Sequence, residues 1–165
     1  MRTFACLALL VLCGRAHGAD TAIDAARTLS ELDQVGRAIA KEKCQRPLEV
    51  KAQFVVQPLA ADATDEMQSH ACRGFRVAVY VSTLAASTRE FPMSVVVESR
   101  HPLLANDWSV GAASANVRAR LGAPYSAAGE SFSYSLRAER SGRDTLTFEV
   151  ESGIVRAVTW SWDID

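Results

Sequence analysis

Two pairs of side chains in this sequence are of types that carry out chemistry. His70 lies two residues before Cys72, and a cysteine with a histidine nearby can act as nucleophile and general base. Asp163 and Asp165, at the C-terminus, could form a carboxylate pair for acid–base catalysis. The simpler interpretation is a disulfide-bonded cysteine beside a surface histidine, together with solvated terminal acids. We therefore predict that the chain is not an enzyme, and a small cell-envelope hydrolase is the alternative.

The sequence also predicts no metal and no cofactor. His101 precedes Pro102, and the chain contains neither H-x-x-x-H nor H-E-x-x-H, the spacings that bind zinc on a helix. The glycines stand singly, so no glycine-rich loop is present to hold a phosphate, and G-x-S-x-G is absent.

The N-terminus has the pattern of a secretory signal peptide. Arg2 is followed by the apolar run "FACLALLVLC", which is too short to cross a bilayer core of roughly 30 Å as a helix. Ala16 and Gly18 supply small side chains at the positions that signal peptidase requires. We predict that residues 1–18 are removed and that the protein is exported to the periplasm. Acylation of Cys13 would instead give an outer-membrane lipoprotein, but a leucine precedes it where a small residue is usual.

The remaining cysteines and the net charge agree with export of a single domain over residues 19–165. Cys44 and Cys72 would most often pair in an oxidising compartment, which would stabilise the fold by roughly 3–4 kcal/mol. Without residues 1–18 the chain has 16 basic and 19 acidic side chains, a net charge of −3. This balance does not favour binding to nucleic acid or to an anionic membrane surface, and no later apolar run is long enough for a transmembrane helix.

The first half of this domain is predicted to contain one helix and three strands. Apolar residues at helical spacing predict a helix over 21–43. The alternation in "EVKAQFVVQ" at 49–57 predicts a half-buried strand whose inner face carries Val50, Ala52, Phe54 and Val56. Residues 58–67 are acidic and small and are predicted to form a surface loop. The strands "GFRVAVYVS" and "MSVVVESR" follow, the second after a turn at Phe91-Pro92.

A short helix is predicted within "VGAASANVRARLGAP", at 110–124, after a loop over 101–110. Val117 and Leu121 are four residues apart and therefore share one helix face. Gly122 can adopt the left-handed conformation that ends a helix, and Pro124 prevents its continuation. The segment contains no catalytic group, so we interpret it as a packing element.

Three further strands are predicted after this helix: "ESFSYSLRAE", "TLTFEVE" and "IVRAVTWSWDID", with a tight turn at Ser152-Gly153 between the last two. Their short connections favour an antiparallel meander, with Ile154, Val158, Trp160 and Trp162 on one face of the last strand. The predicted fold class is α+β: an antiparallel sheet with an N-terminal helix and a short helix packed on one face, and one disulfide.

Residues 108–162 resemble a known family. The elements that carry the resemblance are the helix ending Leu121-Gly122-Ala123-Pro124, the aromatic strand with Phe132 and Tyr134, and "LTFEVESGIV" followed by Val158. Together they are similar to the small outer-membrane lipoprotein (SmpA/OmlA, BamE) family and to the repeat of beta-lactamase-inhibitory protein. The resemblance implies an exported bacterial domain that binds another protein. It does not extend to residues 19–107, and alanine stands where the family carries a Thr or Ser helix cap.

The tryptophans near the C-terminus allow two interpretations. Trp160 and Trp162 either pack in the core beneath a helix or form an exposed aromatic anchor, since binding energy concentrates on such rings. In the second interpretation the partner-binding patch consists of aromatic side chains with two arginines at its edge: Trp108, Tyr125, Tyr134, Trp160, Trp162, Arg118 and Arg120.

The function predicted from these features is binding of another protein in the periplasm. The chain would act as an inhibitor or immunity protein against a toxin or hydrolase, or as an envelope-assembly factor. The alternatives are the hydrolase, using His70 or the acidic tail, and a carrier whose aromatic face lines a pocket for a small apolar ligand. The sequence does not decide between a monomer and a homodimer.

Overall fold

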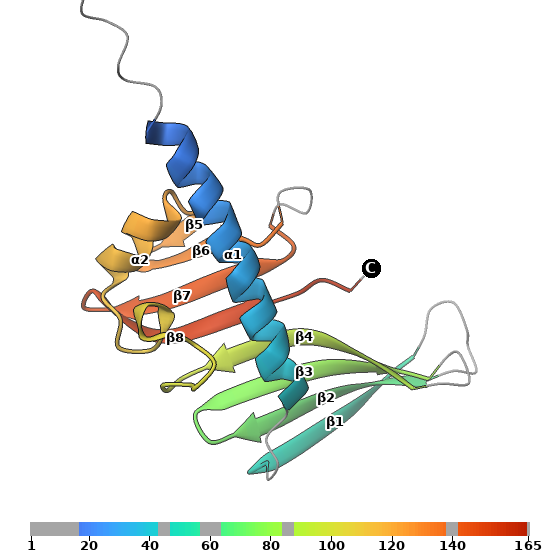
Figure 1. Cartoon of the computed structure of the whole chain (residues 1–165). Coiled ribbons are helices and arrows are strands. Elements are labelled where there is room, and N and C mark those ends of the chain that lie inside the picture. The colour runs from blue at the N-terminus through green and yellow to red at the C-terminus, as the bar shows by residue number, and fades with distance from the viewer. Residues whose placement is uncertain (1–16, 43–46, 57–63, 84–87, 138–141, 165) are drawn as a thin grey trace, which may run out of the picture.

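A long helix crosses one face of an antiparallel sheet, which has eight strands in the part of the chain described here (Figure 1). The computed structural model describes residues 17–42, 47–56, 64–83, 88–137 and 142–164. The helices are α1 (His17–Glu42) and α2 (Ser114–Leu121), with the 3-10 helix η1 (Asn106–Trp108) shortly before α2. The α+β class predicted from the sequence is therefore confirmed.

The strand order in the sheet is β1-β2-β3-β4-β8-β7-β6-β5, so the chain builds each half as a meander and joins the halves where β4 pairs with β8. The strands are β1 (Glu49–Val56), β2 (Thr64–Cys72), β3 (Phe75–Ser82), β4 (Arg89–Val97), β5 (Ser126–Ala128), β6 (Ser131–Ser135), β7 (Thr145–Glu151) and β8 (Ile154–Ser161).

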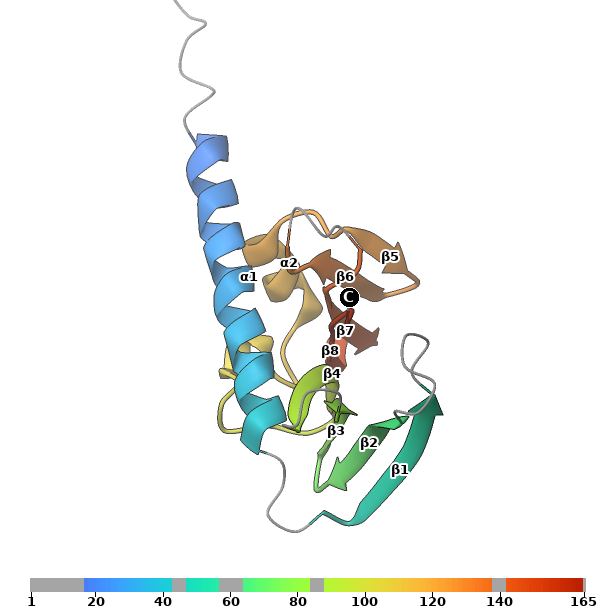
Figure 2. The ribbon, with the colours of Figure 1, turned by 90° about the vertical axis from the view of Figure 1, so that its right-hand side faces the viewer.

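α1 packs on the middle of the sheet, chiefly on β4, and also contacts α2 and, less extensively, β3. Leu32 and Ile39 are buried on its inner side, as the helical spacing of the apolar residues requires. Gly36 allows a close approach, because a Cβ at this position would lie 2.6 Å from the ring of Trp160. Figure 2 shows α1 and α2 on the same side of the sheet, as predicted. α1 begins at His17, earlier than the predicted start of the helix at residue 21.

The first half of the sheet has one more strand than predicted. Residues 64–67 were expected in a surface loop but belong to β2, which pairs with β1 over eight consecutive residues. Phe91 and Pro92 were expected to form a turn but lie within β4, where a β-bulge interrupts the pairing with β3 between Ala78 and Val79. Proline is tolerated there because a bulge relaxes the regular ladder.

The second half follows the prediction more closely. α2 buries Val117 and Leu121 and ends at Gly122, which has φ +75° and donates its N–H to Arg118 O. Ala113 precedes the helix without a side-chain cap. The three predicted strands form β6, β7 and β8, and the short strand β5 was not predicted.

The end of β8 keeps the predicted alternation, but its beginning does not. Val158, Trp160 and Trp162 are buried, whereas Ile154 is 36% exposed and Val155 takes the core position instead. The reason is a register shift between β7 and β8, which adds one residue to β8 and reverses the alternation before it.

The hydrophobic core lies between the helices and the strands β3, β4, β6, β7 and β8. Cys72 is buried at the end of β2, on the edge of this core. Its predicted disulfide partner, Cys44, lies outside the described residues, so the disulfide stays a prediction.

Candidate functional site

Four of the five aromatic residues predicted to form a partner-binding patch are buried. Trp160 is completely enclosed, and its Nε1–H donates to Leu32 O at 2.9 Å. Trp162 Nε1–H donates to Asp33 Oδ1 at 2.7 Å, so both indole donors are used to attach α1 to β8. Trp108 and Tyr134 are also core residues. The exposed aromatic patch is therefore wrong for these four side chains, because the helices cover them.

Tyr134 is held in the core beneath α2. Its hydroxyl donates to Gly122 O at 3.1 Å, and its ring contacts Phe132 and Phe148. Burial raises the pKa of Tyr134, an effect that the nearby positive charge of Arg118 partly offsets. The hydroxyl is therefore a neutral donor at physiological pH and links the end of α2 to the sheet.

The remaining members of the predicted patch are exposed. Arg118 lies over the ring of Phe132 at 4.3 Å, and Arg120 lies over the ring of Trp108 at 5.5 Å. Arg120 also pairs with Asp107, with 2.8 Å between Nη1 and Oδ2. Both arginines thus cover the rim of the core, and Tyr125, 57% exposed, is the one freely presented ring of the predicted set.

The residues considered for catalysis occupy separate structural roles. His70 projects from β2 and its Nε2 lies 3.3 Å from Gln68 Oε1. His101 is buried against Phe75, with 5.0 Å between the ring centroids, and its Nδ1 accepts the N–H of Leu103. Asp165 lies outside the described residues, so the carboxylate pair with Asp163 stays a prediction.

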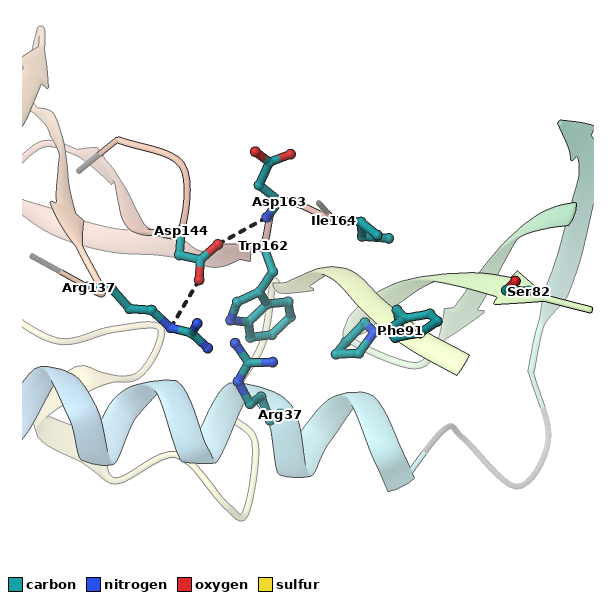
Figure 3. Close-up of a pocket in the computed structure, with 9 residues that line it drawn as sticks. Arg37, Ser82, Phe91, Arg137, Asp144, Trp162, Asp163 and Ile164 are labelled. Atoms are coloured by element: carbon teal, nitrogen blue, oxygen red, sulfur yellow. Dashed lines mark hydrogen bonds and ion pairs between the residues drawn. The ribbon is translucent and has the colours of Figure 1, made fainter. Parts of the chain in front are cut away.

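A cleft of about 410 Å³ opens between α1, β4 and the C-terminal segment (Figure 3). Arg37 lies across the ring of Trp162 at 5.0 Å, and Figure 3 shows Arg137 directed at Asp144. Phe91 forms part of the wall farther along β4. The cleft therefore combines aromatic surface with two arginines, a composition that suits a small anionic or aromatic ligand.

The charged groups of this cleft already bind one another. Arg37 Nε lies 3.1 Å from Asp33 Oδ2, and Arg137 Nε lies 3.2 Å from Asp144 Oδ2. The buried Asp144 also accepts the backbone N–H of Asp163 at 3.1 Å. A ligand anion would have to displace these carboxylates, so we interpret the cleft as the polar joint that fixes the C-terminal segment to α1.

A second surface lies at one end of the sheet, where β1 forms the edge (Figures 1 and 2). Register places three apolar residues of β1 on the same face as the core: Val50 aligns through His70 with Val77, Ala52 through Gln68 with Val79, and Phe54 through Glu66 with Val81. β1 was predicted to be half-buried. Instead Val50 is 50% and Phe54 is 74% exposed, because α1 lies on the middle of the sheet and not over this edge.

The polar side chains of β2 mark the limit of the core. On the helix-facing side of β2, Gln68 Nε2 donates to Glu66 Oε2 at 3.0 Å and lies next to His70, so the three residues form a polar ladder along the strand. Covering this ladder with apolar side chains would desolvate the Glu66 carboxylate, which is costly. The core therefore stops at β2.

Beyond this ladder the sheet is apolar again. We name Leu48, Val50, Ala52 and Phe54 the β1 strip; all four are exposed, and Leu48 comes one residue before β1. An apolar strip bordered by hydrogen-bonding side chains has the composition of a protein interface, in which a polar rim surrounds an apolar centre. Sequence reasoning found the alternation of β1 but missed its exposure. The available signal was the polar inner face of "TDEMQSHAC", which was assigned in part to a loop.

Among the described residues, no group of three or more His, Cys, Asp and Glu side chains is placed so that it could hold a metal ion. None of the helices described here is long and apolar enough to cross a membrane. No protein-family model matches the chain, and no match is found among curated proteins or solved structures.

Proposed function

We propose that this chain is an exported, non-enzymatic protein that binds another protein of the periplasm through the β1 strip. The observation that carries the proposal is the exposure of Phe54 and Val50 on the uncovered part of the helix-facing side of the sheet. Exposed apolar surface of this kind commonly marks an interaction site. An inhibitor or immunity protein and an envelope-assembly factor both fit this surface.

The partner's chemistry follows from the two components of the surface. Phe54 and Leu48 would each fit an apolar recess, and aromatic side chains often contribute much of the binding energy at interfaces. The neighbouring ladder presents the Glu66 carboxylate, so a basic or hydrogen-bond-donating group on the partner would suit the rim. The proposal replaces the aromatic patch predicted from the sequence, of which Tyr125 remains as an exposed ring at the other end of the sheet.

Two features support a protein-binding role over a carrier of a small apolar ligand. The ring of Trp160 is fully enclosed, so it does not line an open pocket. The cleft in Figure 3 is lined in part by Trp162, but this ring is buried, because Arg37 covers it and is itself paired with Asp33.

The test compares two exposed aromatic residues from opposite ends of the sheet. The tagged, exported chain is isolated from the periplasm as wild type, Phe54→Ser and Tyr125→Ser, and the co-purified proteins are quantified. We expect a stoichiometric partner with wild type and Tyr125→Ser, and its loss with Phe54→Ser. Absence of a stoichiometric partner, or retention of the partner by Phe54→Ser, would contradict the proposal. Loss with Tyr125→Ser alone would move the interface to the predicted patch and also count against the β1 strip.

The proposal includes signal cleavage after Gly18 and a disulfide between Cys44 and Cys72. Support for the disulfide comes from a chain of neighbours: the charge of Glu42 at the end of α1 acts on His101, whose ring contacts Phe75, and Phe75 pairs with Cys72. Residue 44 follows the end of α1 closely.

Intact mass measurement of the exported chain, before and after reduction and alkylation, should show an N-terminus at Ala19 and two cysteines protected until reduction. An acylated Cys13 or two freely alkylated cysteines would refute these parts.

A further inference from the structure

The edge of β1 is long and regular, unlike the opposite edge of the sheet. β1 pairs with β2 over eight consecutive residues without a bulge, whereas β5 contributes three residues to the other edge. An edge strand has one row of N–H and C=O groups directed away from the sheet, and natural proteins usually protect such edges with bulges, prolines or short strands. β1 itself, over Glu49–Val56, has none of these, although it carries Lys51 and Pro47 stands two residues before it.

The side chains of β1 match themselves when two copies pair in antiparallel fashion. With a two-fold axis through Val50, Glu49 of each copy lies opposite Lys51 of the other, so the interface contains two such pairs. On the other face Val50 lies opposite its own copy and Ala52 lies opposite Leu48, so that face is apolar over residues 48–52. Directly opposed residues of antiparallel strands share a face and interact, favourably when their charges are opposite.

The two charges are available for this pairing. Within one chain Lys51 Nζ lies 3.3 Å from Glu49 Oε2, and both side chains are more than half exposed. Exposed ion pairs of this type are weak, so exchanging the intrachain pair for pairs to a second copy costs little. The strand has no net charge from these residues, and like charges therefore do not oppose its self-association.

We propose that the protein forms a two-fold homodimer in which the β1 edges of two copies pair with Val50 on the axis. The two sheets then become one continuous sheet, and the β1 strips of both copies form a single apolar floor between the two α1 helices. The partner-binding face of the proposed function stays open in this dimer, since only the edge is used. The dimer does not depend on that function: a monomer could still bind a partner, and a dimer could lack one.

The test uses charge reversal and sedimentation of the purified, exported chain. Wild type should show a concentration-dependent monomer–dimer equilibrium. Glu49→Lys and Lys51→Glu should each weaken the dimer by about tenfold or more, because each homodimer then contains two pairs of like charges. An equimolar mixture of the two variants should regain dimerisation. One chain then carries two basic side chains at positions 49 and 51 and the other carries two acidic ones, so both opposed pairs in the mixed dimer join opposite charges.

The matched control is Glu151→Lys, which reverses a charge in an equally exposed ion pair with Arg156 on the β7–β8 hairpin. It should dimerise as wild type does, and circular dichroism should show all variants folded. A wild-type chain that stays monomeric at the highest concentration tested would overturn the proposal. So would a dimer unaffected by both β1 variants, or weakened equally by the control. Weakening by both variants without recovery in the mixture would overturn the register centred on Val50.

Discussion

The two ends of the sheet use the same alternation of apolar and polar residues with opposite results. In β3, the inner residues Val77, Val79 and Val81 are buried under α1. In β1, the aligned residues Val50, Ala52 and Phe54 are exposed. The difference arises at β2, whose inner face is polar and separates the two apolar rows. Alternation therefore specifies a strand with one apolar face, whereas burial requires that another element cover that face.

The largest expected effect is in the part of the sheet that α1 covers. Trp160→Ala removes a fully enclosed ring and its hydrogen bond to Leu32 O, and should destabilise the fold by about 3–5 kcal/mol, or abolish cooperative unfolding. Phe54→Ala removes an exposed ring of the β1 strip and should change the unfolding free energy by no more than about 0.5 kcal/mol. Urea unfolding followed by circular dichroism measures both. Similar decreases in the unfolding free energy for the two variants would show that the β1 strip is covered in solution.

A smaller loss is expected where α1 approaches β8. Gly36→Ala places a Cβ 2.6 Å from the ring of Trp160, and overpacking of this kind costs about 1–3 kcal/mol. The better helix propensity of alanine opposes this by up to about 1 kcal/mol, so the net effect should be destabilising. Ser30→Ala, at an exposed position of α1, is the control and should be neutral or slightly stabilising. A stabilised Gly36→Ala would indicate that α1 does not pack closely on Trp160.

The smallest expected effect is on the pH dependence of stability near His101. Burial lowers the pKa of His101, and the negative charge of Glu42 offsets this only in part. Because the folded state favours the neutral ring, the unfolded state binds more protons as the pH falls below the ordinary value of about 6.5. Stability should therefore decrease from that pH down to the lowered pKa of the folded state.

Replacement of His101 by Phe keeps a ring against Phe75 and removes the titrating group. The variant should lose part of the decrease in unfolding free energy between pH 7.5 and pH 5, as measured by urea titration at each pH. An unchanged pH dependence in His101→Phe would contradict the burial of this ring.

The parts of the fold predicted correctly are those that depend on near neighbours in the sequence. Val117 and Leu121 lie one helical turn apart, and Gly122 ends α2 because it can adopt a positive φ. The turn at Ser152 and Gly153 likewise connects β7 and β8 through two residues of positive φ. These features were readable because the physical cause lies within a few residues.

The errors arise from the pairing between strands, which the residue types of a single strand do not reveal. Ile154 is exposed because the register shift against β7 reverses the alternation at the start of β8. Residues 64–67 were assigned to a loop because their polar composition hides a strand that β1 and β3 hold by backbone hydrogen bonds. Composition does not report this pairing, since backbone groups of any residue can supply it.

The candidate surface proposed from the structure lies elsewhere than the patch predicted from the sequence. Sequence reasoning favoured a surface with exposed aromatic residues and arginines, and it selected the tryptophans because large rings are enriched at interfaces. Trp160 and Trp162 instead hold α1 on the sheet through their Nε1–H groups. Phe54 is the exposed ring on the uncovered edge, but its local pattern is the same as that of a buried strand residue.

The sequence by itself determined the α+β class, the positions of α1 and α2 and the alternation of most strands, because apolar periodicity and glycine turns act over short distances. Only the tertiary structure decided which apolar faces are buried. α1 is attached to β8 through Leu32 and Trp160, which are 128 residues apart in the chain. That attachment places the helix over β3 and β4 and leaves β1 uncovered, because one helix is too narrow to cover the whole face of the sheet.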